Sequence, residues 1–203
     1  MASRSLDISQ IRSDFPILQR ENRSKPLAFL DNAATSQKPA CVINAISDYY
    51  THTNSNVHRG VYELAEDAEN LYHQARKSIA RRFNVTVDQV VFVRGATEGL
   101  NLVAQSFGPL VLEQGDAMIL SEMEHHANIV PWQILSQKIG FEIRVCPTLS
   151  DGSLDREWIS REFRKKNLKL IALTALSNTL GTVNPIEEIV AEARQYGICL
   201  LYT

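Results

Sequence analysis

Residues 94–99, which read Arg-Gly-Ala-Thr-Glu-Gly, are the stretch of the sequence best suited to hold an anion. Small residues let the backbone approach a ligand closely, and the start of a helix offers N–H groups and the positive end of the helix dipole. With the Thr97 hydroxyl added, these groups can hold a phosphate. The same residues also fit a simple helix cap, because Thr caps helices well and Glu is favoured in a first turn.

Two adjacent histidines, His125 and His126, follow a predicted strand at 117–120. An imidazole at the end of a strand can stack on a planar ring or transfer a proton near neutral pH. Taken alone, the pair fits capping or solvent-exposed histidines better. The zinc-binding spacing His-Glu-x-x-His is absent, and the sequence predicts no metal site.

Two further loops carry polar side chains that can bind a ligand. Residues 177–181 (Ser-Asn-Thr-Leu-Gly) follow a predicted strand at 168–174, and Asn178 can donate a hydrogen bond there. Asn and Gly are also ordinary turn residues. Residues 56–60 read Asn-Val-His-Arg-Gly, and the Arg beside a His can bind an anion. A loop without a ligand explains these residues equally well.

Predicted helices and strands alternate along the chain, and these elements must position the candidate loops. The region 62–83 is apolar at three- and four-residue steps, which predicts a helix with one buried face. Further helices are expected at 8–15, after Pro39, and at 97–107, 129–139, 154–166 and 185–196, with strands at 90–93, 117–120, 141–145, 168–174 and 198–201. This alternation predicts an α/β fold with a mainly parallel sheet and flanking helices. Three of the candidate loops then follow strands and are expected at one edge of the sheet.

Composition narrows the class of protein. The 203 residues are 44% hydrophobic and 22% charged, which is typical of a globular protein. The net charge is -2 with the two signs interspersed, so we expect neither nucleic acid nor a membrane surface as a partner. The start lacks a secretory apolar run and no stretch reaches membrane-spanning length, so a cytoplasmic location is expected. The three cysteines lie far apart, which argues against a disulfide framework.

Five ordered motifs resemble the SUF-type (group II) cysteine desulfurases of the class-V aminotransferase family. They are residues 30–39, 56–60, 94–104, 123–132 and 177–182, and the most specific is the unbroken block 123–132, Met-Glu-His-His-Ala-Asn-Ile-Val-Pro-Trp. The resemblance runs from about Phe15 to Leu201. It implies the large domain of a fold type I, aspartate-aminotransferase-like transferase. We expect an amino-terminal segment at 1–26 and an incomplete cofactor-binding domain at 27–203.

The resemblance also implies a site for pyridoxal 5'-phosphate. Ala96 and Thr97 would hold the cofactor phosphate. His125 would stack on the pyridine ring and assist proton transfer, and Asn178 would hydrogen-bond the ring hydroxyl. These roles agree with the chemistry inferred from the loops themselves.

The reaction implied by the resemblance removes sulfur from L-cysteine, giving L-alanine and an enzyme persulfide. The sulfur would pass to a scaffold or acceptor protein for iron–sulfur cluster assembly. The family works as a homodimer with its active site near the subunit interface. Ala33 would lie on the substrate side, and His58 and Arg59 would lie near the mouth of the site.

The resemblance breaks off where further catalytic residues are expected. Aligned at the Gly197 turn, the Asp that keeps the pyridine nitrogen protonated falls at Thr203. The Schiff-base lysine and the catalytic cysteine of the family lie beyond the chain, and no lysine or cysteine within it stands at those positions. We therefore expect an amino-terminal fragment with little or no desulfurase activity alone.

Two other readings of the sequence stay open. The chain can be an interaction module that pairs with a full-length desulfurase through the dimer surface. It can also derive from a selenocysteine lyase or an aminotransferase of the same fold. The His125-His126 block favours a desulfurase, but these residues do not separate cysteine from selenocysteine as the substrate.

Overall fold

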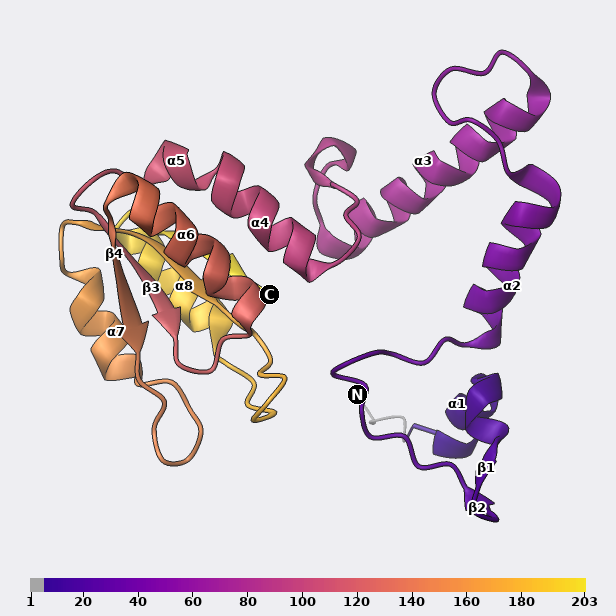
Figure 1. Cartoon of the computed structure of the whole chain (residues 1–203), viewed down its shortest axis with the longest axis horizontal. Coiled ribbons are helices and arrows are strands. Elements are labelled where there is room, and N and C mark those ends of the chain that lie inside the picture. The colour runs from indigo at the N-terminus through magenta and orange to yellow at the C-terminus, as the bar shows by residue number, and fades with distance from the viewer. Residues whose placement is uncertain (1–5) are drawn as a thin grey trace. The chain divides into compact units, whose positions relative to one another are not determined.

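The computed structural model describes residues 6–203, which divide between Val91 and Phe92 into two compact units (Figure 1). We call them the amino-terminal unit (6–91) and the carboxyl-terminal unit (92–203). The boundary predicted at residue 26 falls inside the first unit and stays a prediction. Residues 1–5 of that predicted segment lie outside the described part of the chain.

The amino-terminal unit is mainly helical. Its elements are α1 (Ile8–Ser13), a 3-10 turn (Pro16–Gln19), the antiparallel pair β1 (Glu21–Asn22) and β2 (Lys25–Pro26), α2 (Ala40–Asp48), a π-helical turn (Tyr49–Thr53), α3 (Glu63–Phe83) and a 3-10 turn (Val87–Gln89). Helix α3 confirms the strongest helix prediction. It carries acidic residues in its first turn and arginines in its last, which suits the helix dipole, and it ends at Asn84 in the left-handed conformation.

The carboxyl-terminal unit confirms the predicted α/β fold with a parallel sheet. Its strands are β3 (Ala117–Ser121), β4 (Glu142–Cys146), β5 (Leu168–Leu173) and β6 (Cys199–Tyr202), all parallel, in the order β4-β3-β5-β6. Its helices are α4 (Ala96–Ser106), α5 (Gly108–Val111), α6 (Val130–Ile139), α7 (Arg156–Phe163) and α8 (Ile186–Gln195), with a 3-10 turn at His126–Asn128.

Helices cover both faces of this sheet. Alternate residues of β3 point to opposite sides, so Met118 and Leu120 pack with Trp132 of α6 on one face. On the other face Ile119 packs with residues of α7 and α8 such as Ile159 and Ile189. Figure 1 shows α6 in front of the sheet and α8 behind it. The central strand β3 is buried along its whole length, and this burial fixes the positions of the strand ends.

Two predicted elements differ from the structure. Residues 90–93 were expected to form a strand buried on both faces, but they belong to neither sheet of the described residues, and Val91 is 65% exposed. This prediction was wrong because β-branched residues favour extended backbone, whereas a strand also requires a neighbouring strand to pair with. Helix α7 begins later than predicted, because Asp155 caps it by accepting a hydrogen bond from the Trp158 N–H at 2.8 Å, and it ends at Phe163 instead of at 166.

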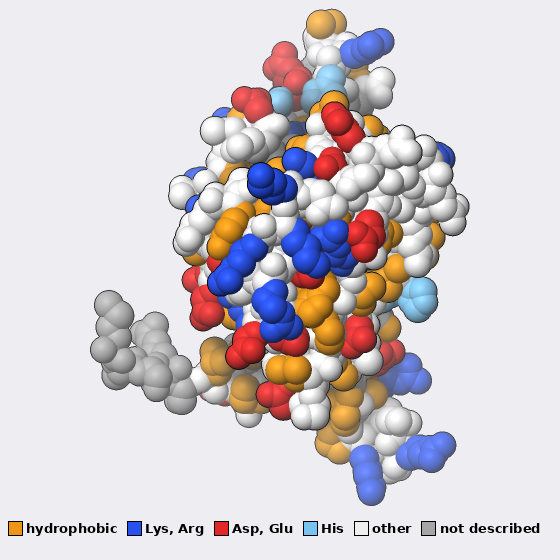
Figure 2. Space-filling model, turned by 90° about the vertical axis from the view of Figure 1, so that its left-hand side faces the viewer, with side chains coloured by type: hydrophobic (Ala, Val, Ile, Leu, Met, Phe, Trp, Pro, Cys, Tyr) orange, Lys and Arg blue, Asp and Glu red, His pale blue; other side chains and the backbone are white. Residues whose placement is uncertain are grey.

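Charged side chains of both signs are interspersed on the side of the molecule that Figure 2 shows. The best-buried ion pair of the described residues joins Arg144 to Glu162 at 3.1 Å, and Arg144 also pairs with Glu142 at 2.7 Å. The hydrogen bond from Arg144 lowers the pKa of the Glu142 carboxyl. Lys165 adds a second contact to Glu162. Among the described residues, no helix combines the length and the apolar character needed to cross a membrane.

Candidate functional site

The order of the strands has a topological switch point between β3 and β5. After β3 the chain forms β4 on one side of it, and then returns to form β5 on the other side. In open α/β sheets, ligands bind outside the carboxyl ends of the strands at such a switch point. The loops that follow β3 and β5 carry His125 and Asn178, so both residues belong to loops that start at neighbouring strand ends.

The His125 ring is fixed by a local hydrogen bond. Its Nδ1 accepts from the backbone N–H of Ala127 at 3.1 Å, and the side chain is exposed. Because Nδ1 acts as an acceptor, the neutral imidazole carries its proton on Nε2. The ring therefore caps the 3-10 turn His126–Asn128, as the simpler reading of the sequence expected, and its Nε2 stays available for a ligand.

A buried carboxylate beside His125 joins the two loops. Glu124 accepts hydrogen bonds from the Ser121 hydroxyl at 2.5 Å, from the Asn128 amide at 2.7 Å and from the Thr174 N–H at 2.9 Å. Asn128 in turn accepts from the indole N–H of Trp132 at 3.1 Å. The role of Glu124 is not evident from the sequence, because a glutamate in a loop is expected to be solvent-exposed unless its buried partners are known.

The loop after β5 forms a compact turn with Asn178 exposed at its tip. The buried Ser177 hydroxyl accepts from the N–H groups of Leu180 at 3.1 Å and Thr179 at 3.4 Å. Gly181 has a positive φ of 75°, which favours glycine at this position. Asn184 closes the base of the loop by donating to the Thr174 carbonyl at 2.8 Å.

Helix α4 begins at Ala96, within the residues predicted to bind a phosphate. Its N-cap is Gly95, which makes no side-chain capping bond, and the exposed Thr97 lies inside the first turn. A shallow depression at this end is lined by Arg94, Gly95, Thr97, Glu98 and Asn101. Arg94 donates to the Glu98 carboxylate through its side chain at 3.1 and 3.2 Å and through its backbone N–H at 2.6 Å. These bonds lower the pKa of Glu98.

The elements that carry Thr97 and His125 lie on the same face of the sheet. Residues of α4 and α6 share one core cluster, and the His126–Asn128 turn packs against α4. The Glu124–Thr174 hydrogen bond then connects the His125 loop to the end of β5, before Asn178. The functional roles of Ala96, Thr97, His125 and Asn178 remain predictions.

The substrate-side candidates all belong to the amino-terminal unit. Ala33 lies in an exposed turn, and His58 and Arg59 lie in an exposed loop before α3. His58 has a positive φ of 82°, which is uncommon for a residue with a side chain. Their proposed place near a substrate remains a prediction.

Burial makes Cys146 a poor nucleophile. Its thiol, at the end of β4, is fully buried, and this burial raises its pKa to about 12. At pH 8 it has roughly a thousandfold less thiolate than a thiol of pKa 9.0, because each pKa unit changes that fraction tenfold. We expect iodoacetamide to label the exposed Cys41 while Cys146 stays unmodified, and peptide mass spectrometry will measure both. Labelling in urea is the control, and equal rates in the native protein would contradict the burial.

Comparison with known proteins identifies the family. The model of the family "Aminotransferase class-V" matches residues 28–202. A cysteine desulfurase of Serratia proteamaculans is 46% identical over 97% of this chain, and one of Salmonella dublin is 48% identical over 96% of it. Each alignment covers 48% of the relative, so the chain spans about half the length of these curated relatives.

Solved structures agree with this result. The apo cysteine desulfurase of Thermococcus onnurineus matches all of this chain and 48% of its own, with a TM-score of 0.88 and 31% identity. The cysteine desulfurase CsdA of Escherichia coli matches 98% of this chain with a TM-score of 0.82 and 30% identity. Homologues in this family depend on pyridoxal phosphate. The chain belongs to the class-V aminotransferase family and has the fold of the pyridoxal-phosphate-dependent cysteine desulfurases.

Proposed function

We propose that this chain is part of a SUF-type cysteine desulfurase and that its carboxyl-terminal unit contributes the pyridoxal phosphate site. The main support is the order of the strands, because the loops after β3 and β5 begin side by side and are joined by Glu124. The polar groups at this site suit pyridoxal phosphate. A helix start without a side-chain cap suits a phosphate, and an exposed imidazole and an exposed amide suit a planar ring with a hydroxyl group.

Each residue has a distinct role in this proposal. When bound, pyridoxal phosphate supplies an electron sink for bond cleavage next to an amino group. The N–H groups at the start of α4 and the Thr97 hydroxyl hold the phosphate, with Ala96 leaving room for it. His125 lies against the ring and moves a proton at Nε2, since its Nδ1 already accepts from Ala127. Asn178 donates to the ring hydroxyl.

The proposed reaction converts L-cysteine to L-alanine and leaves the sulfur on the enzyme as a persulfide. A scaffold or acceptor protein then receives the sulfur for iron–sulfur cluster assembly in the cytoplasm. Ala33 lies on the substrate side, and His58 and Arg59 lie near the mouth of the site. In the complete protein, two subunits form a homodimer.

The phosphate role of Thr97 predicts a selective loss of affinity. We expect Thr97→Val to weaken binding of pyridoxal phosphate about tenfold, the effect of losing one hydrogen bond to a charged group. Binding of pyridoxal, which lacks the phosphate, should not change. Equilibrium dialysis of both ligands measures this, with Thr51→Val, an exposed threonine outside the candidate loops, as the matched control. Equal affinities of the two variants for pyridoxal phosphate would overturn the assignment.

We also propose that the 203-residue polypeptide does not turn over L-cysteine by itself. All of its lysines are exposed, which does not suit a Schiff-base lysine, and the buried Cys146, with its raised pKa, does not suit a sulfur acceptor. An assay of sulfide and alanine release from L-cysteine with added pyridoxal phosphate should give no signal above a protein-free blank. Turnover near that of a full-length relative would contradict this proposal.

A further inference from the structure

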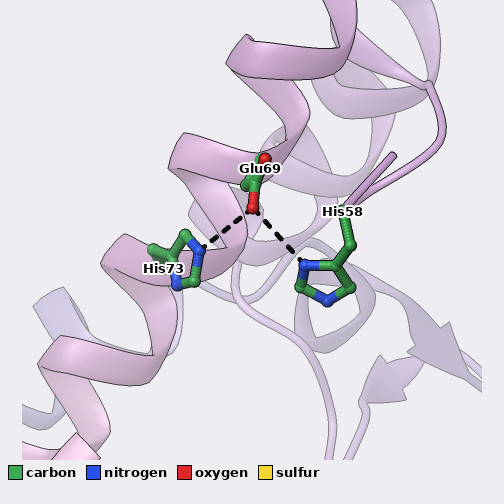
Figure 3. Close-up of side chains that lie close together, drawn as sticks. All are labelled: His58, Glu69 and His73. Carbon is green, nitrogen blue, oxygen red and sulfur yellow. Dashed lines mark hydrogen bonds and ion pairs between the residues drawn. The ribbon is translucent and has the colours of Figure 1, made fainter. Parts of the chain in front are cut away.

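Three side chains of the amino-terminal unit converge on one point at the surface of α3. Glu69 and His73 lie one helical turn apart on the same face of α3, and His58 reaches them from the preceding loop (Figure 3). The His58 Nδ1 lies 3.5 Å and the His73 Nε2 lies 3.4 Å from the same oxygen, Oε1 of Glu69. All three ligand atoms lie within 4.8 Å of one another. Among the described residues this is the only group of its kind.

The two distances to Glu69 are long for charge-assisted hydrogen bonds, and they also fit a shared metal ion. Charge-assisted N–H to carboxylate bonds are typically about 2.7–2.9 Å long. In tetrahedral zinc sites the metal lies about 2.0–2.2 Å from N and O ligands, so neighbouring ligand atoms are about 3.3–3.5 Å apart. Both Glu69–histidine distances fall in or at the limit of the second range. The spacing of the two histidine nitrogens from Glu69 is therefore compatible with ligation of one metal ion.

The surroundings hold the ligands in place. The ring of His58 packs edge-on against Tyr72, with centroids 5.4 Å apart, and the backbone of His58 has a positive φ of 82°. The Tyr72 hydroxyl accepts from Arg76 at 2.6 Å, and Arg76 also donates to the Val90 carbonyl. The nearby guanidinium is thus directed at Tyr72 and Val90. Lys77 and Asp88 line the same hollow and carry opposite charges.

We propose that His58, Glu69 and His73 form a binding site for Zn²⁺, with water completing the coordination. Two imidazoles and one carboxylate are ligands that suit zinc better than Mg²⁺ or Ca²⁺, which prefer oxygen. The three side chains are 57%, 37% and 49% exposed, so solvent reaches the open position. The sequence alone predicted no metal site, because His58 is far from the two helical ligands and the helical pair has the order Glu-x-x-x-His.

A titration of the full chain with Zn²⁺ tests the site. After treatment with a chelator and removal of it, isothermal titration calorimetry should detect one site in the wild-type chain. We expect His73→Gln to weaken this binding at least about tenfold, since even partners outside the ligand shell typically cost that much. His52→Gln removes an exposed histidine outside the cluster and should bind as wild type. Equal binding by His73→Gln and wild type would overturn the proposal.

A second measurement separates metal binding from loss of folding. Saturating Zn²⁺ should raise the urea midpoint of the wild-type chain and of His52→Gln, but not that of His73→Gln or Glu69→Gln, because a ligand stabilises only the state that binds it. If Zn²⁺ raises the midpoint of every variant alike, the ion binds elsewhere and the proposal fails. Both experiments omit pyridoxal phosphate, so their outcome is independent of the proposed desulfurase function.

Discussion

Replacing Glu124 with alanine is expected to destabilise the carboxyl-terminal unit by about 3–4 kcal/mol. The substitution removes the acceptor of three buried donors, on Ser121, Asn128 and Thr174, and each unsatisfied buried donor costs about 1–3 kcal/mol, although the serine hydroxyl can rotate to another partner. Urea unfolding of the full chain, followed by tryptophan fluorescence, measures the loss. Both tryptophans, Trp132 and Trp158, lie in this unit and report on it.

Two further variants make the Glu124 prediction specific. Glu124→Gln keeps the size but places an amide NH₂ opposite the Asn128 NH₂, and Asn128 cannot turn around because its oxygen accepts from Trp132. We expect a loss of about 1–2 kcal/mol from this variant. Glu157→Ala, at a highly exposed glutamate, should change stability by less than about 0.5 kcal/mol. Similar stability of Glu124→Ala and Glu157→Ala would show that the network contributes little.

Trp132→Ala is expected to cost about 3–5 kcal/mol, the range for truncating a large buried aromatic residue. Trp132 is fully buried between α6 and the sheet, where it packs with Met118 and Leu120, and it also donates to Asn128. Trp132→Phe fills most of the space but leaves the Asn128 oxygen without this donor, so we expect a smaller loss. Circular dichroism during urea unfolding measures both variants without relying on the indole signal. A loss below about 1 kcal/mol for Trp132→Ala would contradict the packing described here.

The sequence predicted most of the elements because their signals are local. Helix α3 has a clear apolar stripe, and the runs that became β3 and β5 are short, apolar and buried on both faces, as in a parallel sheet. The run 90–93 has the same local character but joins neither sheet. Pairing depends on which strands lie beside a segment, and no pattern within four residues carries that information.

The candidate site was predictable in its parts but not in its arrangement. The residue types at 94–99, 123–132 and 177–182 indicated a phosphate, an imidazole and an amide at strand ends. The order β4-β3-β5-β6, which brings two of the loops to neighbouring strands, is a property of the whole sheet. Two further features could not be predicted for a related reason. One partner of Glu124 lies far away in the sequence, and His58 lies on a different element from Glu69 and His73.

Glu124 and His125 are adjacent in the chain but differ in burial, and this difference is useful for engineering. Glu124 points inward and holds two loops together, whereas His125 next to it is exposed, and Asn178 is exposed at the tip of the second loop. Residues 125 and 178 can therefore be randomised together in a mutant library while Glu124, Asn128 and Thr174 are kept. The scaffold would tolerate many such combinations, and new ligand preferences could be selected on it with little loss of soluble protein.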